Sequence, residues 1–306
     1  MAPNNIQAFV PEIYSKKLAL AERKMTNFLN NFCNRDWEGE IKQFGDTVRI
    51  SVPDPENIVI GQGVIADTSS IYPTQRVMTI NKSMNFAFKI NDIEKAQSQF
   101  DIIEGSAALA MQKMQDLICL ELQNEVFANA GVEEYGSTAA PIEVDPDTVY
   151  DFVVDLRVKL TAKGVLNSEG FYTYKGNAEQ SKQLNPMLVV TPEIYGEFLK
   201  SRVLTHPTVA GDDILQSGER KQIAGFEITV DTMLGQVEGA TDALFPYIAG
   251  TKMGITFANQ FNVMETLRDL DSFADIVRGL ELYGYEIIQP NSLIKGFVKK
   301  ADAAGG

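Results

Sequence analysis

The chain has 306 residues, of which 44% are hydrophobic and 22% charged, a composition typical of one large globular domain or two smaller ones. Its formal net charge of -14 repels phosphate, which argues against tight sequence-specific nucleic-acid binding but not against loose contact with DNA. No apolar run is long enough to span a bilayer, and Met1–Val10 lacks the basic start and apolar stretch of a signal peptide.

Residues 1–36 predict an arm. A helical pattern follows Pro11 and gives way to an asparagine-rich stretch that suits a fraying helix end or a turn.

Residues 37–90 predict an extended loop built on a β-hairpin. Thr47–Val52 alternates strictly between apolar and polar residues, and a longer return strand of the same kind spans Met78–Ile90. The connection Glu56–Thr74 is rich in turn residues, yet it carries apolar side chains that would be a liability unless a partner covered them. We therefore predict a subunit interface at Ile58, Ile60, Val64, Ile65, Ile71 and Tyr72.

Asn91–Ala130 predicts one unusually long helix, about 60 Å at 1.5 Å per residue. Asn91 and Glu94 form a capping box, and apolar residues then recur at spacings of three and four in a stripe that includes Leu117 and Leu122. A strut that projects from the body and a long core helix both remain open interpretations of this pattern.

Gly105 and Ser106 lie in the middle of this predicted helix. A Gly-Ser pair is a common cause of helix bending, so we predict a hinge at these two residues.

From Pro141 onward, helices and strands alternate, which predicts an α/β or α+β lobe. Together with the hairpin and the long helix before it, the chain as a whole is predicted to be α+β. Asp145-Pro146 and Thr191-Pro192 each place a capping residue before a proline and predict two helix starts. The predicted strands are Met187–Val190, Ile223–Val230, Leu244–Ala249, Lys252–Phe257, Asn262–Arg268 and Tyr283–Gln289.

No motif predicts a catalytic, cofactor or metal site. Cys33 and Cys119 have no metal-ligand or redox spacing, and the only histidine, His206, has no second histidine to act with it. Neither a phosphate-binding loop nor a nucleophile elbow occurs. The three acidic pairs are expected to be solvated or to cap helices: Asp145 with Asp147, Asp212 with Asp213, and Asp269 with Asp271.

The order of arm, projecting hairpin, long helix, mixed lobe and closing strands resembles the major capsid proteins of tailed phages, which have the Hong Kong 97 fold. Three local phrases are similar to that family as well. They are Met187–Tyr195, Ile223–Ile228, and Phe273–Leu280 followed by Tyr283-Gly284-Tyr285 and Pro290.

The resemblance implies a subunit that assembles through pentamers and hexamers into an icosahedral shell around packaged double-stranded DNA. It implies a place in the virion after assembly in the host cytoplasm, with a separate scaffolding protein, a portal and room for a decoration protein as partners. Ile13, Tyr14 and Leu18 of the arm would lie against an adjacent subunit. The implied units are an N-terminal arm (1–36), an extended loop (37–90), a peripheral domain with a spine helix (91–140), an axial domain (141–256), and a return to the peripheral domain with a C-terminal tail (257–306).

Three alternatives stay open from the sequence. An encapsulin-type compartment shares the fold and encloses cargo enzymes. A tail or decoration component would lack ring-forming arms, and an acidic soluble hydrolase would work as a monomer with paired carboxylates.

Overall fold

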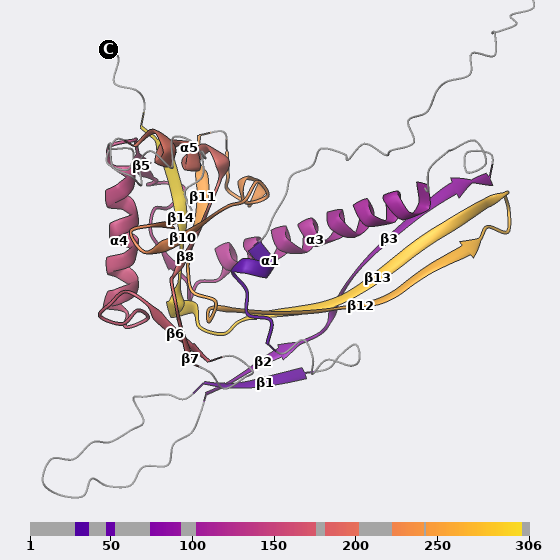
Figure 1. Ribbon diagram of the computed structural model, residues 1–306, viewed down its shortest axis with the longest axis horizontal. Coiled ribbons are helices and arrows are strands. Elements are labelled where there is room, and N and C mark those ends of the chain that lie inside the picture. The colour runs from indigo at the N-terminus through magenta and orange to yellow at the C-terminus, as the bar shows by residue number, and fades with distance from the viewer. Residues whose placement is uncertain are drawn as a thin grey trace, which may run out of the picture.

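The computed structural model describes residues 28–36, 47–52, 74–92, 102–175, 181–201, 222–241 and 243–301. Figure 1 shows these parts arranged as two units. The globular unit is a helix-covered sheet at one end of the molecule. The projecting unit, formed by α3 with β3, β12 and β13, extends from it as a long helix beside a long sheet.

The globular unit is built on a mixed seven-stranded sheet, in which β8 runs parallel to β10 and antiparallel to β11. Its main path, in spatial order, is β4 (Glu133–Glu134), β14 (Leu293–Lys300), β11 (Phe245–Gly250), β8 (Met187–Val190), β10 (Phe226–Val230) and β9 (Gln222–Ile223). The seventh strand, β5 (Ile142–Val144), pairs with β14 beyond β4. A separate two-stranded sheet consists of β6 (Tyr172–Lys175) and β7 (Ser181–Leu184).

Helices cover both faces of the seven-stranded sheet. Because strand side chains alternate between faces, Leu188 and Val190 of β8 pack with α4 (Val149–Ala162) and α5 (Pro192–Lys200). Met187 and Val189 point the other way and pack in a second cluster with α3. All four residues of β8 are therefore buried, as expected of a central strand.

The projecting unit consists of α3 (Ile102–Ala128) and an antiparallel three-stranded sheet in the order β12 (Ile255–Arg268), β13 (Ala274–Ile287), β3 (Lys82–Asn91). The 27 residues of α3 correspond to about 40 Å of helix. Met114, Ile118 and Leu122 on α3 share one core cluster with sheet residues of both units. The helix thus ties the two units together.

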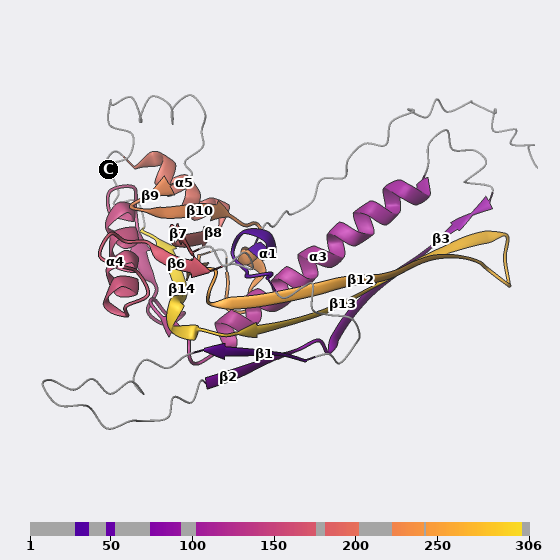
Figure 2. The same cartoon turned by 60° about the horizontal axis from the view of Figure 1, so that its bottom comes forward.

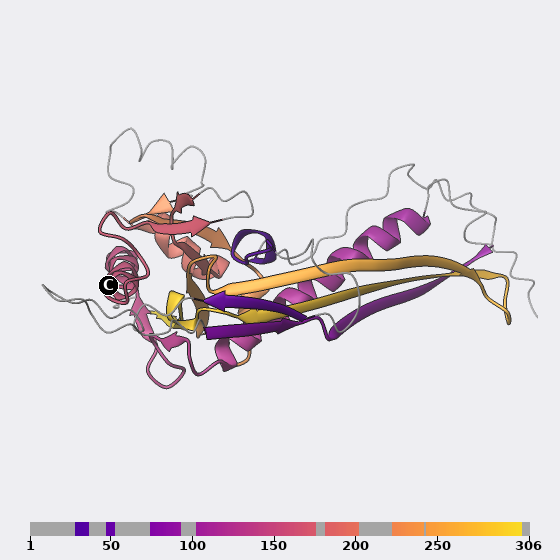
Figure 3. The same cartoon turned by 90° about the horizontal axis from the view of Figure 1, so that it is seen from below.

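Two further segments pack at the base of the projection. β1 (Thr47–Val52) and β2 (Thr74–Thr79) form a two-stranded sheet. In Figures 1 and 2 this sheet lies on the opposite side of the three-stranded sheet from α3, and Figure 3 shows it from below. The short helix α1 (Phe28–Asn31) leads into Asn34, whose N–H and carbonyl bond the edge of β12 at Ile255 and Phe257 over 2.8 and 2.9 Å. The two 3₁₀ helices are η3 (Leu234–Gln236) and η4 (Pro290–Ser292).

Several predicted elements are confirmed. β1 and β8 have the predicted bounds, and α5 begins at the predicted Thr191-Pro192 start. The long helix is confirmed over Ile102–Ala128, while residues 93–101 of the prediction lie outside the described residues. None of the helices in the described ranges has the length and apolar character needed to cross a membrane.

Other predictions are corrected. The single return strand is two strands, because Met78 and Ile80 pack into a cluster on one side of the three-stranded sheet, whereas Met84 and Phe86 pack against the cluster of α3 on the other. The predicted strand Ile223–Val230 is a tight hairpin of β9 and β10. Ala224 and Gly225 make its turn, with φ values of 46° and 85°.

The strands near the end of the chain also differ from the prediction. Lys252–Phe257 and Asn262–Arg268 merge into the single strand β12, which continues past a register shift between Phe261 and Val263. β14 was not predicted, and it lies inside the seven-stranded sheet of the globular unit.

Candidate assembly surfaces

The described side chains include no metal cluster and no exposed cysteine. No group of three or more His, Cys, Asp and Glu side chains within these ranges is placed to hold a metal ion. Cys33 and Cys119 are both buried, and burial raises the pKa of the Cys33 thiol, so it stays protonated and a poor nucleophile. His206 lies outside the described residues.

The acidic pairs within the described ranges have structural partners. Asp145 accepts hydrogen bonds from the backbone N–H groups of Thr148 (2.7 Å) and Asp147 (2.9 Å), and these bonds lower the pKa of Asp145. Asp269 accepts from the Lys89 ammonium and from the Ser272 hydroxyl, which lower the pKa of Asp269. The pair Asp212 and Asp213 lies outside the described residues. The carboxylates of Asp145 and Asp269 are therefore both engaged by nearby hydrogen-bond donors.

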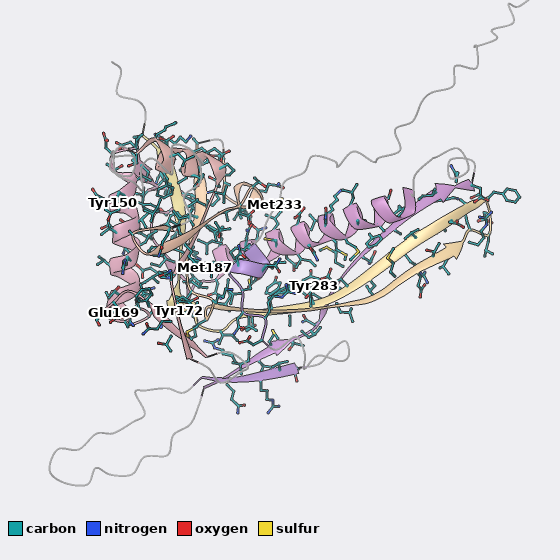
Figure 4. The ribbon with its side chains drawn as sticks, viewed as in Figure 1. Tyr150, Glu169, Tyr172, Met187, Met233 and Tyr283 are labelled. Atoms are coloured by element: carbon teal, nitrogen blue, oxygen red, sulfur yellow. The ribbon has the colours of Figure 1, made fainter. Side chains whose placement is uncertain are left out.

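The projecting unit is held by two sets of polar contacts along α3, and its distal end exposes apolar side chains. The first anchor is a polar group that fixes α3 to β13 and β3, here called the Glu121 cluster (Lys82, Glu121, Tyr283 and Tyr285). Lys82 Nζ donates to Glu121 Oε1 at 2.6 Å and to the Tyr285 hydroxyl at 2.5 Å. The Tyr283 hydroxyl donates to the second carboxylate oxygen of Glu121, and Figure 4 shows Tyr283 between α3 and the sheet.

The charges of the Glu121 cluster stabilise each other. Partial burial alone would raise the pKa of Glu121, but hydrogen bonds from Lys82 and Tyr283 outweigh it, so the pKa of Glu121 is lowered. Burial alone would likewise lower the pKa of Lys82, but its bonds to Glu121 and Tyr285 raise it. Both side chains are therefore charged at neutral pH.

Replacing Glu121 by glutamine should lower the free energy of unfolding of the unassembled chain at pH 7 by about 1 kcal/mol, a value reduced because the pair is partly exposed. The folded pKa of Glu121 lies below the unfolded value of about 4.3. The stabilisation is therefore present above that pH and is lost as the pH falls through the folded pKa. Denaturant melts from pH 7 down to pH 3 should show the two proteins converging in acid.

The matched control is Glu125→Gln, one turn further along α3 and exposed. It should change the free energy of unfolding by no more than about 0.5 kcal/mol at every pH. Equal losses in the two variants would show that the Glu121 cluster contributes nothing specific.

The second anchor joins the end of α3 to the globular sheet. Lys295 of β14 donates from Nζ to the carbonyls of Phe127 and Asn129, both at 2.7 Å. These carbonyls belong to the last helical residues and the turn beyond them, where no further helical N–H can reach. In addition, Gln123 Nε2 on α3 donates to the buried Asp231 carboxylate at 2.8 Å.

The distal end of the projection is the turn between β12 and β13, residues 269–273, here called the tip. Leu270 and Phe273 are 99% and 83% exposed, the largest values among the exposed apolar side chains of the described residues. Ion pairs hold the flanking strands: Arg268 binds Asp92 and Asp275, and Lys89 binds Asp269. The tip therefore presents two uncovered apolar side chains on a braced turn.

A shallow groove of about 400 Å³ lies on the three-stranded sheet, here called the sheet groove. Arg278 and Glu265 form an ion pair of 2.6 Å within its lining. The groove is lined by Asn85, Phe86, Ala87, Glu265, Arg278, Gly279 and Leu280.

The predicted interface residues of the loop and arm are not placed by the structure. Ile58, Ile60, Val64, Ile65, Ile71, Tyr72, Ile13, Tyr14 and Leu18 all lie outside the described residues. The predicted hinge residues Gly105 and Ser106 lie within α3, half-buried, and the helix continues through both.

Leu270 and Phe273 were missed from the sequence. The available signal was a five-residue turn, Asp-Leu-Asp-Ser-Phe, in which polar turn residues alternate with two large apolar side chains between predicted strands.

Comparison with known proteins shows the fold. No protein-family model matches the sequence, and no curated protein sequence matches it. Among solved structures, a chain from Mycobacterium phage Che8 is similar at 19% identity and a TM-score of 0.73, covering 95% of this chain and 97% of its own. A capsid structure of cyanophage P-SCSP1u matches at 11% identity and a TM-score of 0.64, covering 96% and 94%.

The mature capsid of bacteriophage PhiM1 contains a chain that matches at 13% identity and a TM-score of 0.64, covering 95% of this chain and 92% of its own. The matches span nearly the whole of each chain. The protein therefore has the mixed helix-and-sheet fold of phage capsid subunits, of the Hong Kong 97 type.

Proposed function

We infer that this chain is the major capsid protein of a tailed phage, which assembles through pentamers and hexamers into an icosahedral shell around double-stranded DNA. The observation that carries the proposal is the projecting unit with its uncovered tip, in a fold shared over nearly its whole length with phage capsid chains. In a compact monomeric enzyme, the apolar end of such a projection would stay exposed to solvent. In a shell, it can be buried between neighbouring copies.

The proposed roles follow the segments of the chain. Residues 1–36 would be the N-terminal arm, 37–90 the extended loop, and 91–140 the start of the peripheral domain, with α3 as its spine helix. Residues 141–256 would be the axial domain, and 257–306 would return to the peripheral domain and end in a tail. The units interleave in space, since β3 pairs with β13 in the projecting sheet and β14 pairs with β11 in the globular sheet.

Assembly, and not turnover, would be the physical activity. Many weak, repeated contacts around closed rings sum to a durable shell. The predicted contacts of the extended loop and arm would bury the apolar residues named for them in the sequence. Gly105 and Ser106 would let the spine helix bend as the shell changes size, because glycine lowers the cost of departing from helical geometry.

The proposed partners are further copies of the chain, a separate scaffolding protein, a portal and, where one exists, a decoration protein. Contact with packaged DNA would be loose and non-specific, which suits the net charge of -14. The protein would act in the virion after assembly in the host cytoplasm.

Electron microscopy of the purified chain, expressed alone and with candidate scaffolding proteins from the same source, tests the function. Closed shells of uniform size are the expected result. Shells that enclose a cargo enzyme would point to an encapsulin-type compartment, and tubes to a tail component. A stable monomer with hydrolase activity under every condition would overturn the proposal.

A further inference from the structure

We propose that, in the assembled shell, the tip of one copy inserts into the sheet groove of a second copy of this chain. The inference rests on the proposed function, because it needs many copies in fixed relative positions. It goes further by naming the two surfaces that meet, Leu270 and Phe273 on one side and the groove beside Arg278 on the other.

The tip is built as a protrusion. Leu270 and Phe273 are uncovered although the turn that carries them is fixed at both ends. Arg268 Nη1 lies 2.7 Å from Asp92 Oδ1 and 3.1 Å from Asp275 Oδ1, which ties the end of β12 to β13 and to the end of β3. Ser272 adds a 2.6 Å bond to Asp269 within the turn. Ordering such a turn before contact reduces the entropy lost when it is buried.

The sheet groove opens on the face that α3 does not cover. Phe86 packs against the cluster of α3, so its neighbours Asn85 and Ala87 point to the opposite face. Their partners across the strands are Leu280 and Arg278. Gly279 pairs with Phe86, so a Cβ there would point to the α3 face and lie 2.4 Å from the Phe86 ring. On the open face, Ala87 and Leu280 therefore lie beside the ion pair of Arg278 with Glu265.

The charges of the two surfaces are complementary. The carboxylate of Asp271 in the tip has no ion-pair partner among the described residues. Arg278 at the groove is 56% exposed and uses one side of its guanidinium for Glu265. For a chain of net charge -14, local charges of opposite sign at a contact reduce the repulsion between copies.

One chain cannot fill its own groove. Ala87 lies opposite Arg278 on β13, and β13 begins at Ala274 just beyond the tip. About 13 Å of strand at 3.3 Å per residue therefore separates the tip from the groove in the same molecule. Two different patches on identical copies make a heterologous contact, which closes into a ring when the rotation between copies allows it.

Disulfide trapping tests the contact with the double variant Leu270→Cys, Ala87→Cys. A disulfide needs Cβ atoms about 4 Å apart, so within one chain it cannot form, and the natural cysteines are buried. Shells oxidised with copper phenanthroline should yield covalently linked multimers on non-reducing gels. The control pair Leu270→Cys, Val158→Cys, with Val158 59% exposed on α4, should remain monomeric on the gel.

The single variants distinguish other occupants of these surfaces. Ala87→Cys alone should react with a maleimide in the unassembled chain and be protected in shells. Protection without cross-linking to position 270 would show that something else fills the groove. Efficient cross-linking of Leu270→Cys alone would show tips meeting tips. Either result overturns the proposal.

Assembly titrations give a second readout. Phe273→Ala should raise the lowest concentration at which shells form by about tenfold, as expected for losing a buried aromatic contact, whereas Val158→Ala should leave it unchanged. Asp271→Lys should weaken assembly, and adding Arg278→Asp should restore it in part. If the unaltered chain forms no shells, either alone or with a scaffolding protein, the proposed function fails. If shells form and Phe273→Ala assembles normally, only this inference fails.

Discussion

Alanine at position 296 should lower the free energy of unfolding by about 3 kcal/mol or more and leave much of the chain insoluble on expression. Gly296 lies in β14 and packs closely against the backbone of Tyr135 and Gly136, which lie between β4 and β5. A Cβ built at Gly296 would lie 2.0 Å from the carbonyl oxygen of Tyr135 and 2.9 Å from that of Gly136. These are backbone atoms, so no side-chain rotation relieves the overlap.

The covering segment cannot step aside cheaply. The Tyr135 N–H donates to the carbonyl of Lys295 at 2.9 Å, and the N–H of Phe297 donates to the carbonyl of Gly136 at 2.8 Å. The buried Tyr247 hydroxyl also donates to the Tyr135 carbonyl. Moving Tyr135 away from a new methyl group would strain or break these hydrogen bonds, each worth about 1 kcal/mol.

Thermal and urea melts of the unassembled chain measure the effect. Gly196→Ala is the matched control, because a Cβ at that position in α5 meets nothing within 4 Å. Alanine in a helix is better than glycine by about 1 kcal/mol, so this control should be neutral or stabilising. Unchanged melts of Gly296→Ala would mean that the close approach over β14 is not present in solution.

Leu122→Ala should cost about 2–5 kcal/mol, the range for deleting a buried leucine side chain. Leu122 is fully buried on α3, in the cluster that also contains Val189 of β8 and Phe257 of β12. The lost methyl groups would leave a cavity at the place where the two units share a core. Because this core is shared by both units, the loss of packing should also make the projecting unit more susceptible to proteolysis.

Leu117→Ala supplies the control on the same helix. Leu117 is 44% exposed, so its truncation should cost less than about 1 kcal/mol. Urea melts measure both variants, and limited proteolysis reports on the projection. A similar loss in both variants would contradict the assignment of the buried face of α3.

The contrast between these two leucines shows how far the sequence predicts the fold. The sequence predicted the long helix and its apolar residues, because these residues recur with the 3.6-residue period of an α-helix. It placed Leu117 and Leu122 in one stripe, however, and only the tertiary structure decides which apolar residue meets a neighbour. Strands with local stop signals, such as Met187–Val190, were predicted for the same reason as the helix.

The misplaced strands have a different cause. From Met78 to Ile90 the apolar alternation is interrupted only by Lys82, and nothing in this stretch indicates that the chain leaves β1 and joins β13. That change depends on partners far along the sequence. The turn of Ala224 and Gly225 was hidden because both residues are small and apolar, although glycine at a positive φ could have suggested it.

The candidate assembly surfaces were also predicted only in part from the sequence. The sequence predicted that apolar side chains of this protein need covering by other copies, and it placed them in the extended loop and arm, outside the described residues. It did not single out Leu270 and Phe273, because two exposed apolar residues in a turn are ordinary until the turn is known to end a long projection. The sheet groove has no sequence signal, since its lining comes from three strands.

The position of β14 in the sheet determines when during synthesis the globular unit can finish folding. Residues 293–300 fit between strands synthesised much earlier, so a nascent polypeptide on the ribosome holds an open gap beside β11 until they emerge. Lys295 of the same strand then secures the end of α3. The seven-stranded sheet can therefore be completed only after residues 293–300 have been synthesised.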